Sequence, residues 1–318
     1  VGNPNQSVHK ILVALDMTEL NISYAIDHGV DMVISHHPFL FKPIHDIDLS
    51  TCKGRMIENL IRHRITSFAA HTNLDSAVQG VNDALAEKLG LQECKGFVPV
   101  MTYSSYKFTL YITAAHAKLL KKKLDSLRGK DIESYYVVDD ADDFTENIRV
   151  EFRVPGQLVK QVKDMISSLD KSAKYDVYKL VNHGYKETMG RIGKFPFPMS
   201  VEEALSYIKN KLEIPVLRYA GNRDRLVEKI AILGGAGAEF AEVAKSMGAD
   251  LYLTGDLKYH EAQDAAMNGL VIADGGHFYT ERVIIPYLAK RLRDEFKTRG
   301  WNVGVLEDVR AKDIFHCV

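Results

Sequence analysis

Cysteine is scarce in this chain. Its three cysteines, Cys52, Cys94 and Cys317, lie far apart and form no Cys-x-x-Cys pair. This spacing argues against a disulfide framework and against a thiolate zinc site, and it fits the reducing cytoplasm. An excess of one charge is also missing, because 41 Lys and Arg stand against 42 Asp and Glu, a net charge of -1. Without a long basic stripe, nucleic acid is disfavoured as a partner.

Long apolar runs are absent as well. No stretch reaches the roughly 20 apolar residues of a membrane span, and none resembles a signal peptide. We therefore expect a cytoplasmic protein without a membrane partner. The chain does have an ordinary globular composition over 318 residues, 46% hydrophobic and 26% charged, which is enough for more than one domain.

Two distant segments repeat one order of sequence patterns. Residues 8–37 read VHKILVALDMTELNISYAIDHGVDMVISHH, and residues 227–260 read VEKIAILGGAGAEFAEVAKSMGADLYLTGDLKYH. Each runs from a Lys-Ile strand through a turn and a short amphipathic helix to a second strand, which is the pattern of a βαβ unit with parallel strands. A further strand follows each copy, at residues 67–70 and 270–273. We therefore predict an α/β fold in which two related halves form one domain.

The middle of the chain has a different pattern. Apolar residues alternate in KFTLYI and RVEFRV, and two stretches with helical spacing follow these strands, at residues 114–127 and 157–169. With the strand expected at residues 175–181, this order matches the ferredoxin-like βαββαβ pattern. The lysines of AKLLKKK favour a solvated helix face over an anion site.

These patterns predict three parts of the chain. The first α/β half covers residues 1–101, an inserted ferredoxin-like α+β domain covers residues 102–184, and the second α/β half covers residues 185–318. The two halves together would form the metal-binding domain described next.

Side chains that suit metal binding follow the predicted strands. His36 and His37 end the strand MVIS, and Pro38 favours extended backbone at His37, so the two imidazoles point apart. Diverging imidazoles can each serve one ion of a close pair, although histidines at strand ends also hydrogen-bond to loops. The apolar run PFLFKPI at residues 38–44 is predicted to form a wall that keeps this edge ordered and partly dry.

Two further pairs lie at other strand ends. Asp75 in HTNLD is either a ligand or, like Ser76, close to the N-cap of a helix expected over residues 76–90. His277 and Glu281 share a helix face if a helix has begun at His277, and otherwise form a surface pair near a helix start. Because ligand sites in open α/β sheets gather at the carboxyl ends of strands, we expect these side chains to meet.

The combined set contains imidazoles and carboxylates without a thiolate. Such a set suits zinc, iron or manganese, and it predicts a dinuclear centre because a carboxylate can bridge two ions. The predicted ligands are His36, His37, Asp75, His277 and Glu281.

Three other features near these strand ends have alternative explanations. His71 and His260 could move protons or orient ligands, or each could be structural. The run GGAG at residues 234–237 follows a strand and could bind a phosphate through its amides. It lacks the full GxGxxG spacing, so tight packing of helix on strand is the simpler explanation.

The motifs ISHHPFLFKPI, AAHTNLD, GRIG, GGAG, YLTGDLKYHEAQDA and DGGHFYTE occur in this order. In this order they resemble the type 2 GTP cyclohydrolase I homologs, also called Nif-three-like proteins, over essentially the whole chain. The resemblance implies the same five metal ligands, with Glu281 as the bridge, and a PII/CutA-like inserted domain. It also implies a homohexamer whose metal centres face an internal cavity. In the family a segment with an Asp-Asn-Val-Gly stretch precedes the Val-Gly found here at Val1, and this segment lies near the site.

From these residues and this resemblance we expect a hydrolase with two divalent transition-metal ions per chain, zinc being favoured over iron or manganese. A hydroxide that bridges the ions would be the nucleophile. The substrate would be GTP, as in a GTP cyclohydrolase, or another nucleotide or phosphoester. A second hypothesis uses the same ligands without turnover, in a metal-binding or effector-sensing regulatory hexamer.

Overall fold

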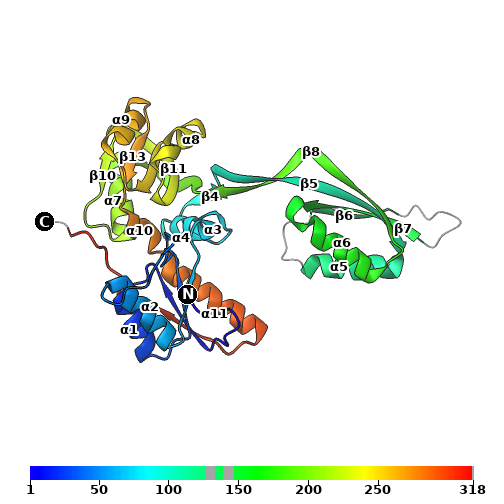
Figure 1. Ribbon diagram of the computed structural model, residues 1–318. Coiled ribbons are helices and arrows are strands. Elements are labelled where there is room, and N and C mark those ends of the chain that lie inside the picture. Colours follow the sequence, from blue (N-terminus) through cyan, green and yellow to red (C-terminus); the bar gives the residue numbers. More distant parts are fainter. Residues whose placement is uncertain (127–132, 139–146, 317–318) are drawn as a thin grey trace. The chain divides into compact units, whose positions relative to one another are not determined.

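The structure is a computed structural model that describes residues 1–126, 133–138 and 147–316 (Figure 1). The chain divides into two compact units, residues 1–98 with 188–318, and residues 99–187. The larger unit contains a four-stranded and a six-stranded sheet, and the smaller unit contains a second four-stranded sheet. The fold is therefore mixed α/β with several sheets, as the sequence predicts.

The four-stranded sheet of the larger unit is entirely parallel, in the order β14-β1-β2-β3. Its strands are β1 (Lys10–Ala14), β2 (Met32–Ser35), β3 (Thr66–Ala69) and β14 (Gly304–Glu307). Helix α1 (Glu19–Asp27) joins β1 to β2, and Thr18 caps it by accepting a hydrogen bond from the N–H of Asn21. The first predicted βαβ unit is thereby confirmed.

Both faces of this sheet are buried. Leu12 packs with Ile22 of α1 and Leu60 of α2 (Cys52–Arg62). Val13, which points the opposite way from the same strand, packs with Ile285 of α11 (Ile284–Arg299). Because successive side chains of a strand alternate between faces, a strand covered on both sides reads as a continuous apolar run. Figure 1 shows α1 and α2 on one side of these strands and α11 on the other.

The six-stranded sheet has the order β10-β13-β12-β11-β9-β4. Strands β11, β12 and β13 are parallel, whereas β9 pairs antiparallel with β11 and with β4, and β10 pairs antiparallel with β13. The second predicted βαβ unit is confirmed by the parallel pair of β11 and β12. The strands are β4 (Gln92–Lys95), β9 (Arg191–Ser200), β10 (Arg218–Ala220), β11 (Leu226–Ala236), β12 (Leu251–Gly255) and β13 (Val271–Asp274).

Helices cover both faces of the six-stranded sheet. Ala244 of α8 and Ala265 of α9 belong to one buried cluster, and Leu85 of α4 and Ile208 of α7 belong to the other. The helices are α3 (Thr72–Ser76), α4 (Val81–Lys88), α7 (Val201–Leu212), the 3-10 turn η2 (Ala238–Phe240), α8 (Ala241–Ser246), α9 (Tyr259–Met267) and α10 (His277–Glu281). No helix in the described ranges is both long and apolar enough to cross a membrane.

The single helix predicted over residues 76–90 is wrong. Helix α3 ends at Ser76, Ala77 has extended backbone with ψ of 145°, and α4 begins only at Val81. A Cβ atom at Gly80 would lie 1.8 Å from the carbonyl oxygen of Leu74, so the chain folds back tightly on α3 here. Asp75 is therefore not an N-cap. It lies within α3.

The smaller unit has the strand and helix order β5-α5-β6-β7-α6-β8 and the sheet order β6-β7-β5-β8. Strand β7 pairs antiparallel with β5 and with β6. Both helices lie on one face of the sheet (Figure 1). The elements are β5 (Val98–Thr113), α5 (Ala114–Ser126), β6 (Glu133–Val138), β7 (Asn147–Pro155), the 3-10 turn η1 (Gly156–Leu158), α6 (Val159–Leu169) and β8 (Lys174–Met189).

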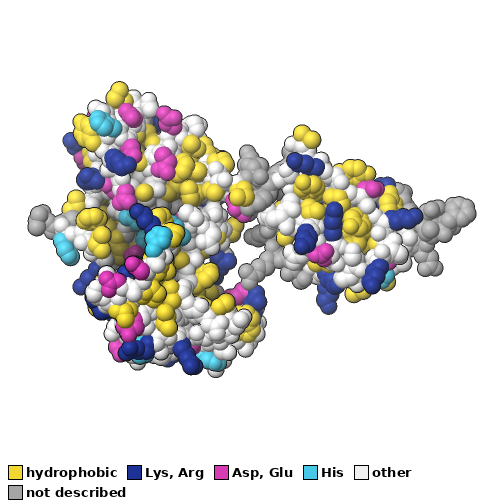
Figure 2. Space-filling view, viewed as in Figure 1, with side chains coloured by type: hydrophobic (Ala, Val, Ile, Leu, Met, Phe, Trp, Pro, Cys, Tyr) yellow, Lys and Arg dark blue, Asp and Glu magenta, His cyan; other side chains and the backbone are white. Residues whose placement is uncertain are grey.

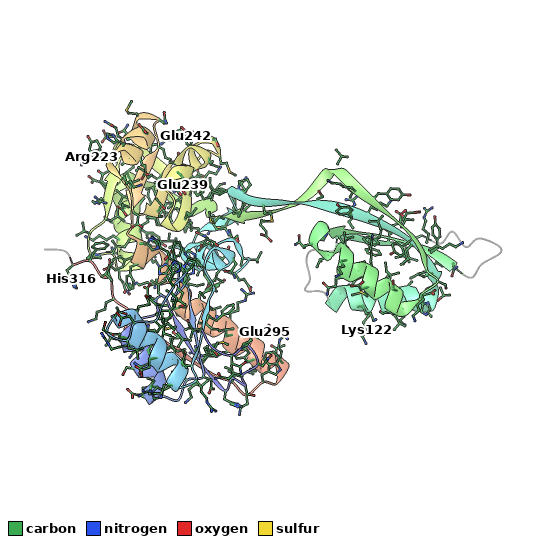
Figure 3. The ribbon with its side chains drawn as sticks, in the orientation of Figure 1. Lys122, Arg223, Glu239, Glu242, Glu295 and His316 are labelled. Carbon is green, nitrogen blue, oxygen red and sulfur yellow. The ribbon has the colours of Figure 1, made fainter. Side chains whose placement is uncertain are left out.

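The alternation predicted for β5 and β7 is confirmed by burial. Phe108, Leu110, Val150 and Phe152 are at most 1% exposed and pack against the two helices in one cluster. Helix α5 buries Leu120 in this cluster and turns its lysines outward, and Lys121 forms an ion pair with Asp125 at 2.9 Å. Figure 3 shows Lys122 pointing away from the sheet. The predicted solvated face of this helix is confirmed.

Two neighbouring leucines on α5 give a test of this packing. Leu120 is fully buried and Leu119 is 50% exposed. Leu120→Ala should lower the free energy of unfolding by about 2–5 kcal/mol, because it leaves a cavity in the core. Leu119→Ala should change it by less than about 0.5 kcal/mol. Chemical denaturation followed by circular dichroism measures both, and equal losses for the two variants would contradict the burial of this face.

Candidate metal centre

The histidine pair extends the pairing of β1 and β2. The N–H groups of His36 and His37 donate to the carbonyl oxygens of Ala14 and Leu15, at 3.2 and 2.9 Å. The backbone at both histidines is therefore held as a continuation of the strand. The ring centroids are nevertheless only 5.0 Å apart, with the planes inclined by 46°. Both rings face Glu281, so the prediction that the two imidazoles point apart is wrong.

Two short helices supply the remaining side chains. Asp75 lies on α3, immediately after β3. His277 and Glu281 are the first and last residues of α10, which follows β13. The helix has therefore begun at His277, and the i, i+4 spacing brings its Nε2 atom to 3.1 Å from Glu281 Oε2.

The carboxylate of Glu281 lies at the centre of this group. Its Oε2 atom is 2.8 Å from His37 Nε2, and its Oε1 atom is 3.6 Å from His36 Nε2. His36 Nε2 also lies 3.5 Å from Asp75 Oδ1, and His277 Nε2 lies 3.3 Å from His37 Nε2. The two oxygens of one carboxylate thus face two different sets of nitrogen and oxygen atoms.

Burial makes the first of these sets unusual. His36, Asp75 and Glu281 are 2%, 9% and 4% exposed. Among the described residues, neither His36 Nε2 nor Asp75 Oδ1 has a hydrogen-bond partner, although both atoms are shielded from water. Buried polar atoms are normally paired, because leaving one unpaired costs roughly 1–3 kcal/mol. Two such atoms aimed at one place are what a bound cation would satisfy.

The separations also suit metal ligands. In each of three groups of side chains, the potential ligand atoms lie within 4.8 Å of one another. One group is His36, His37 and His71, and the other two share Glu281, which lies with His36 and Asp75 in one and with His37 and His277 in the other. Ligands at about 2.0–2.1 Å from a tetrahedral ion are roughly 3.3 Å from each other. The observed distances of 2.8 to 3.6 Å bracket that value. Residues of both groups could therefore hold a metal ion.

The charges of these groups shift one another's pKa values. Burial alone would raise the pKa of Glu281, but hydrogen bonds with His277 and His37 and the nearby charge of His36 outweigh burial and hold it below its usual range. Burial opposes protonation of His37, yet hydrogen bonds to Asp16 and Glu281 raise its pKa to about 10. Burial raises the pKa of Asp75 to about 6. The cluster is thus built to balance a buried negative charge with positive charge.

Two carboxylates that the sequence analysis missed contact the Nδ1 atoms of His37 and His277. Asp16 Oδ1 is 2.7 Å from His37 Nδ1, and Asp256 Oδ2 is 2.7 Å from His277 Nδ1. Asp16 lies just after β1 and Asp256 just after β12, the strands beside those that precede His37 and His277. A polar residue at the end of a neighbouring parallel strand was the signal that could have identified them.

A third missed residue, Asn82, joins the two segments that form the centre. Its side chain is 1% exposed. The Nδ2 atom donates to the carbonyl oxygen of Asp75 at 3.0 Å, and the Oδ1 atom accepts from the N–H of Gly234 at 3.0 Å. Asn82 therefore fixes the backbone of Asp75 relative to strand β11.

The GGAG run serves close packing. Gly235 has φ of +69°, and a Cβ atom there would lie 2.2 Å from Glu281 Oε1. The N–H groups of Gly234 and Gly235 already donate to Asn82 Oδ1 and Thr280 Oγ1. A phosphate would have to displace both hydrogen bonds, so the packing explanation holds.

Of the two remaining candidate histidines, His71 lies beside the histidine pair and His260 does not. The ring of His71 lies 5.3 Å from that of His36 and 5.8 Å from that of His37, between centroids. Burial and the neighbouring charges of His36 and His37 lower the pKa of His71. His260 is exposed on α9, where its ring contacts Tyr259, and the groups of potential ligands among the described residues do not include it.

The predicted wall after the histidine pair forms only in part. Phe39 is 6% exposed and packs under Lys53, whose Nζ atom lies 4.2 Å from the ring centre. Phe41 is 74% exposed and touches His71 edge-on at 6.3 Å, and Ile44 is 43% exposed. The stretch beyond residue 40 is therefore a surface segment beside the centre, since no strand or helix anchors it before α2.

Comparisons with known proteins extend over the whole chain. The family model of Duf34/NIF3 (NGG1p interacting factor 3) matches residues 1–312. A Halalkalibacterium halodurans protein named GTP cyclohydrolase 1 type 2 homolog is 32% identical, over 99% of this chain and 91% of that protein. A Bacillus subtilis protein of the same name is 31% identical, over 96% and 88%. The crystal structure of a Bacillus cereus protein related to NIF3 has a TM-score of 0.88 and 32% identity, covering 100% of this chain and 92% of that one.

The close approach of Gly235 to Glu281 can be tested with a matched pair of variants. Gly29 has φ of +61°, and no described atom lies within 4 Å of a Cβ built on it. Gly235→Ala and Gly29→Ala should both lose roughly 1–2 kcal/mol of stability from the left-handed backbone. Gly235→Ala alone should also lower the metal content of the protein, because the methyl group displaces the Glu281 carboxylate. Elemental analysis after loading with Zn²⁺ measures this, and a normal metal content in Gly235→Ala would contradict the role of that carboxylate.

Proposed function

Because the chain belongs to the DUF34/NIF3 family, we propose that it is a metal-dependent hydrolase that holds two divalent transition-metal ions. The observation that carries this proposal is the position of the Glu281 carboxylate, which directs Oε1 toward His36 and Oε2 toward His37 and His277. A carboxylate in this position can bridge two ions.

Each of the two positions has its own ligands. The inner position is lined by His36, Asp75 and Glu281 Oε1, and the outer position by His37, His277 and Glu281 Oε2. Imidazole and carboxylate without thiolate favour zinc, with iron and manganese as alternatives. With three protein ligands at each position, coordination sites remain for water and substrate, as in catalytic metal sites.

The ions would supply Lewis acidity, since they polarise a substrate oxygen and lower the pKa of water. The residues of the chain would hold the ions, exclude water and move protons. Glu281 keeps the two positions together, and the burial of His36, Asp75 and Glu281 keeps water away from the inner position. His71 lies beside both His36 and His37, where its imidazole can take a proton from the attacking water and return it to the leaving group.

The name of the relatives supports a proposal for the substrate class. The two relatives from Halalkalibacterium halodurans and Bacillus subtilis are named GTP cyclohydrolase 1 type 2 homolog. We therefore propose opening of the GTP ring as the first candidate reaction and hydrolysis of a nucleotide or other phosphoester as the second. Both reactions need a water made nucleophilic beside a polarised oxygen or ring carbon, which two adjacent ions provide.

We further propose that residues 1–101 and 185–318 are related halves of one metal-binding domain, and that residues 102–184 are an inserted ferredoxin-like domain of the PII/CutA kind. The compact unit of residues 99–187 supports this division. So do the order β5-α5-β6-β7-α6-β8 and the sheet order β6-β7-β5-β8, which fit the ferredoxin-like pattern.

Turnover by metal-loaded protein tests the proposed reaction. Protein loaded with Zn²⁺ should hydrolyse a member of a panel of GTP, other nucleotides and aryl phosphoesters, and His36→Ala and Glu281→Ala should abolish that activity. His71→Asn should lower kcat by about 10²–10⁴-fold without loss of metal. His260→Asn, an exposed histidine on α9, is the matched control and should retain the wild-type kcat. Product analysis and elemental analysis together measure these effects.

Two outcomes would count against this function. Activity that survives both His36→Ala and Glu281→Ala would exclude this centre as the catalytic one. Tight metal binding without turnover of any member of the panel would instead favour the metal-binding or effector-sensing regulatory protein.

We also propose that the protein is a homohexamer. Large apolar side chains are exposed on the larger unit, and such surfaces mark contacts with other chains. Figure 2 shows hydrophobic side chains gathered on the drawn face of this unit. Phe41, Ile47, Leu49, Ile314 and Phe315 are 74%, 51%, 50%, 83% and 75% exposed.

Light scattering after size exclusion tests the assembly. The expected mass is six times that of the 35.7-kDa chain, because burial of these side chains against other copies removes apolar area from water. A single species with the mass of one chain at micromolar concentration would contradict the assembly.

A further inference from the structure

Two Asp–His pairs at the centre are built in the same way. Asp16 precedes His37 by 21 residues, and Asp256 precedes His277 by 21 residues. In each pair the aspartate follows the first strand of a βαβ unit, β1 or β12, and the histidine follows the second strand, β2 or β13. Parallel pairing of the strands brings the two side chains together, with 2.7 Å between oxygen and nitrogen in both cases.

The histidine of the inner position has a different partner. The Nδ1 atom of His36 lies 2.8 Å from the carbonyl oxygen of Ala70, a neutral backbone group. In both histidines of the outer position Nδ1 therefore contacts a carboxylate, whereas in the histidine of the inner position Nδ1 contacts a backbone carbonyl. The outer position is also more open, since the side chains of His37 and His277 are 23% and 39% exposed against 1% for His36.

A carboxylate fixes which ring nitrogen carries the proton. An ionised carboxylate only accepts hydrogen bonds, so Nδ1 of His37 and of His277 must donate to it. In the neutral ring the lone pair is then on Nε2, the atom that faces Glu281 Oε2 at 2.8 Å from His37 and 3.1 Å from His277. A metal ion bound there would take this lone pair in place of the proton that Nε2 shares with Glu281. Such a partner also makes the imidazole a stronger electron donor, and its loss typically weakens metal binding by about 10–100-fold.

Both aspartates are held in place by their own surroundings. The backbone carbonyl of Asp16 accepts a hydrogen bond from Asn21 Nδ2 at 2.9 Å, and Asn21 is buried against Asp308. Asp256 has φ of +55°, a left-handed backbone that aspartate tolerates better than most residues. The side chains of Asp16 and Asp256 are nevertheless each 51% exposed. Packing in the protein interior therefore does not explain their positions.

We propose that Asp16 and Asp256 are positioning residues of the outer position, which orient His37 and His277 and thereby set the affinity for one of the two ions selectively. This inference rests on the proposed two-ion centre. It assigns to the outer position a dependence on carboxylates that contact Nδ1 of its histidines, a contact that His36 of the inner position lacks.

Titration with Co²⁺ against a chelator tests the inference, because visible absorption reports each Co²⁺ ion bound. Asp16→Asn and Asp256→Asn keep the side-chain shape and remove the charge. Each should weaken one of the two binding steps by about 10–100-fold and leave the other step unchanged. Asp27→Asn on α1 and Asp264→Asn on α9 are the controls, since both residues are exposed on the helices that follow the two aspartates. The controls should bind both ions as the wild type does.

Nitrogen-15 spectra of the Zn²⁺-loaded wild-type protein provide a second measurement that needs no variant. His37 and His277 should carry the proton on Nδ1. Unchanged affinities in both Asp→Asn variants, equal weakening of both steps, or protons on Nε2 would overturn the inference. Failure of the wild-type protein to bind two ions would instead contradict the two-ion centre itself, so the two claims fail separately.

Discussion

The centre depends on how one buried negative charge is balanced. Glu281 is 4% exposed, and an ionised carboxylate taken out of water costs several kcal/mol unless opposite charges and hydrogen bonds surround it. Imidazole nitrogens of His36, His37 and His277 provide that balance from two distant parts of the chain. His37 and Glu281 are 244 residues apart, so the same contact that stabilises the charge also ties the end of β2 to α10.

The surroundings are shaped to this charge. Gly235 leaves the space that the Glu281 carboxylate fills, and Asn82 holds the backbone of Asp75 to that of Gly234. These contacts confine the inner set of ligand atoms, while the outer set stays partly open to solvent. A rigid inner side beside an accessible outer side is consistent with the proposed hydrolysis, in which a substrate must reach one side of the pair.

Much of this arrangement could be predicted from the sequence because it follows from local patterns. The order of strand, helix and strand is visible in the apolar periodicity. A polar residue at the carboxyl end of a parallel strand lies at the sheet edge, together with the residues that end the neighbouring strands. This reasoning brought His36, Asp75 and Glu281 together correctly in space. It missed Asp16 and Asp256, because an aspartate after a strand resembles an ordinary turn residue until the strands are paired. It also missed the break after Ser76, since the close approach of Gly80 to Leu74 comes from a local turn that apolar periodicity does not show.

The proposed centre places the Glu281 carboxylate between two metal ions. Anomalous diffraction at the zinc edge, on crystals grown with Zn²⁺, measures this most directly. We expect two peaks per chain about 3.5–4 Å apart, one near His36 and Asp75 and the other near His37 and His277, with a Glu281 oxygen bound to each. A single peak, or two peaks that do not share Glu281, would contradict it.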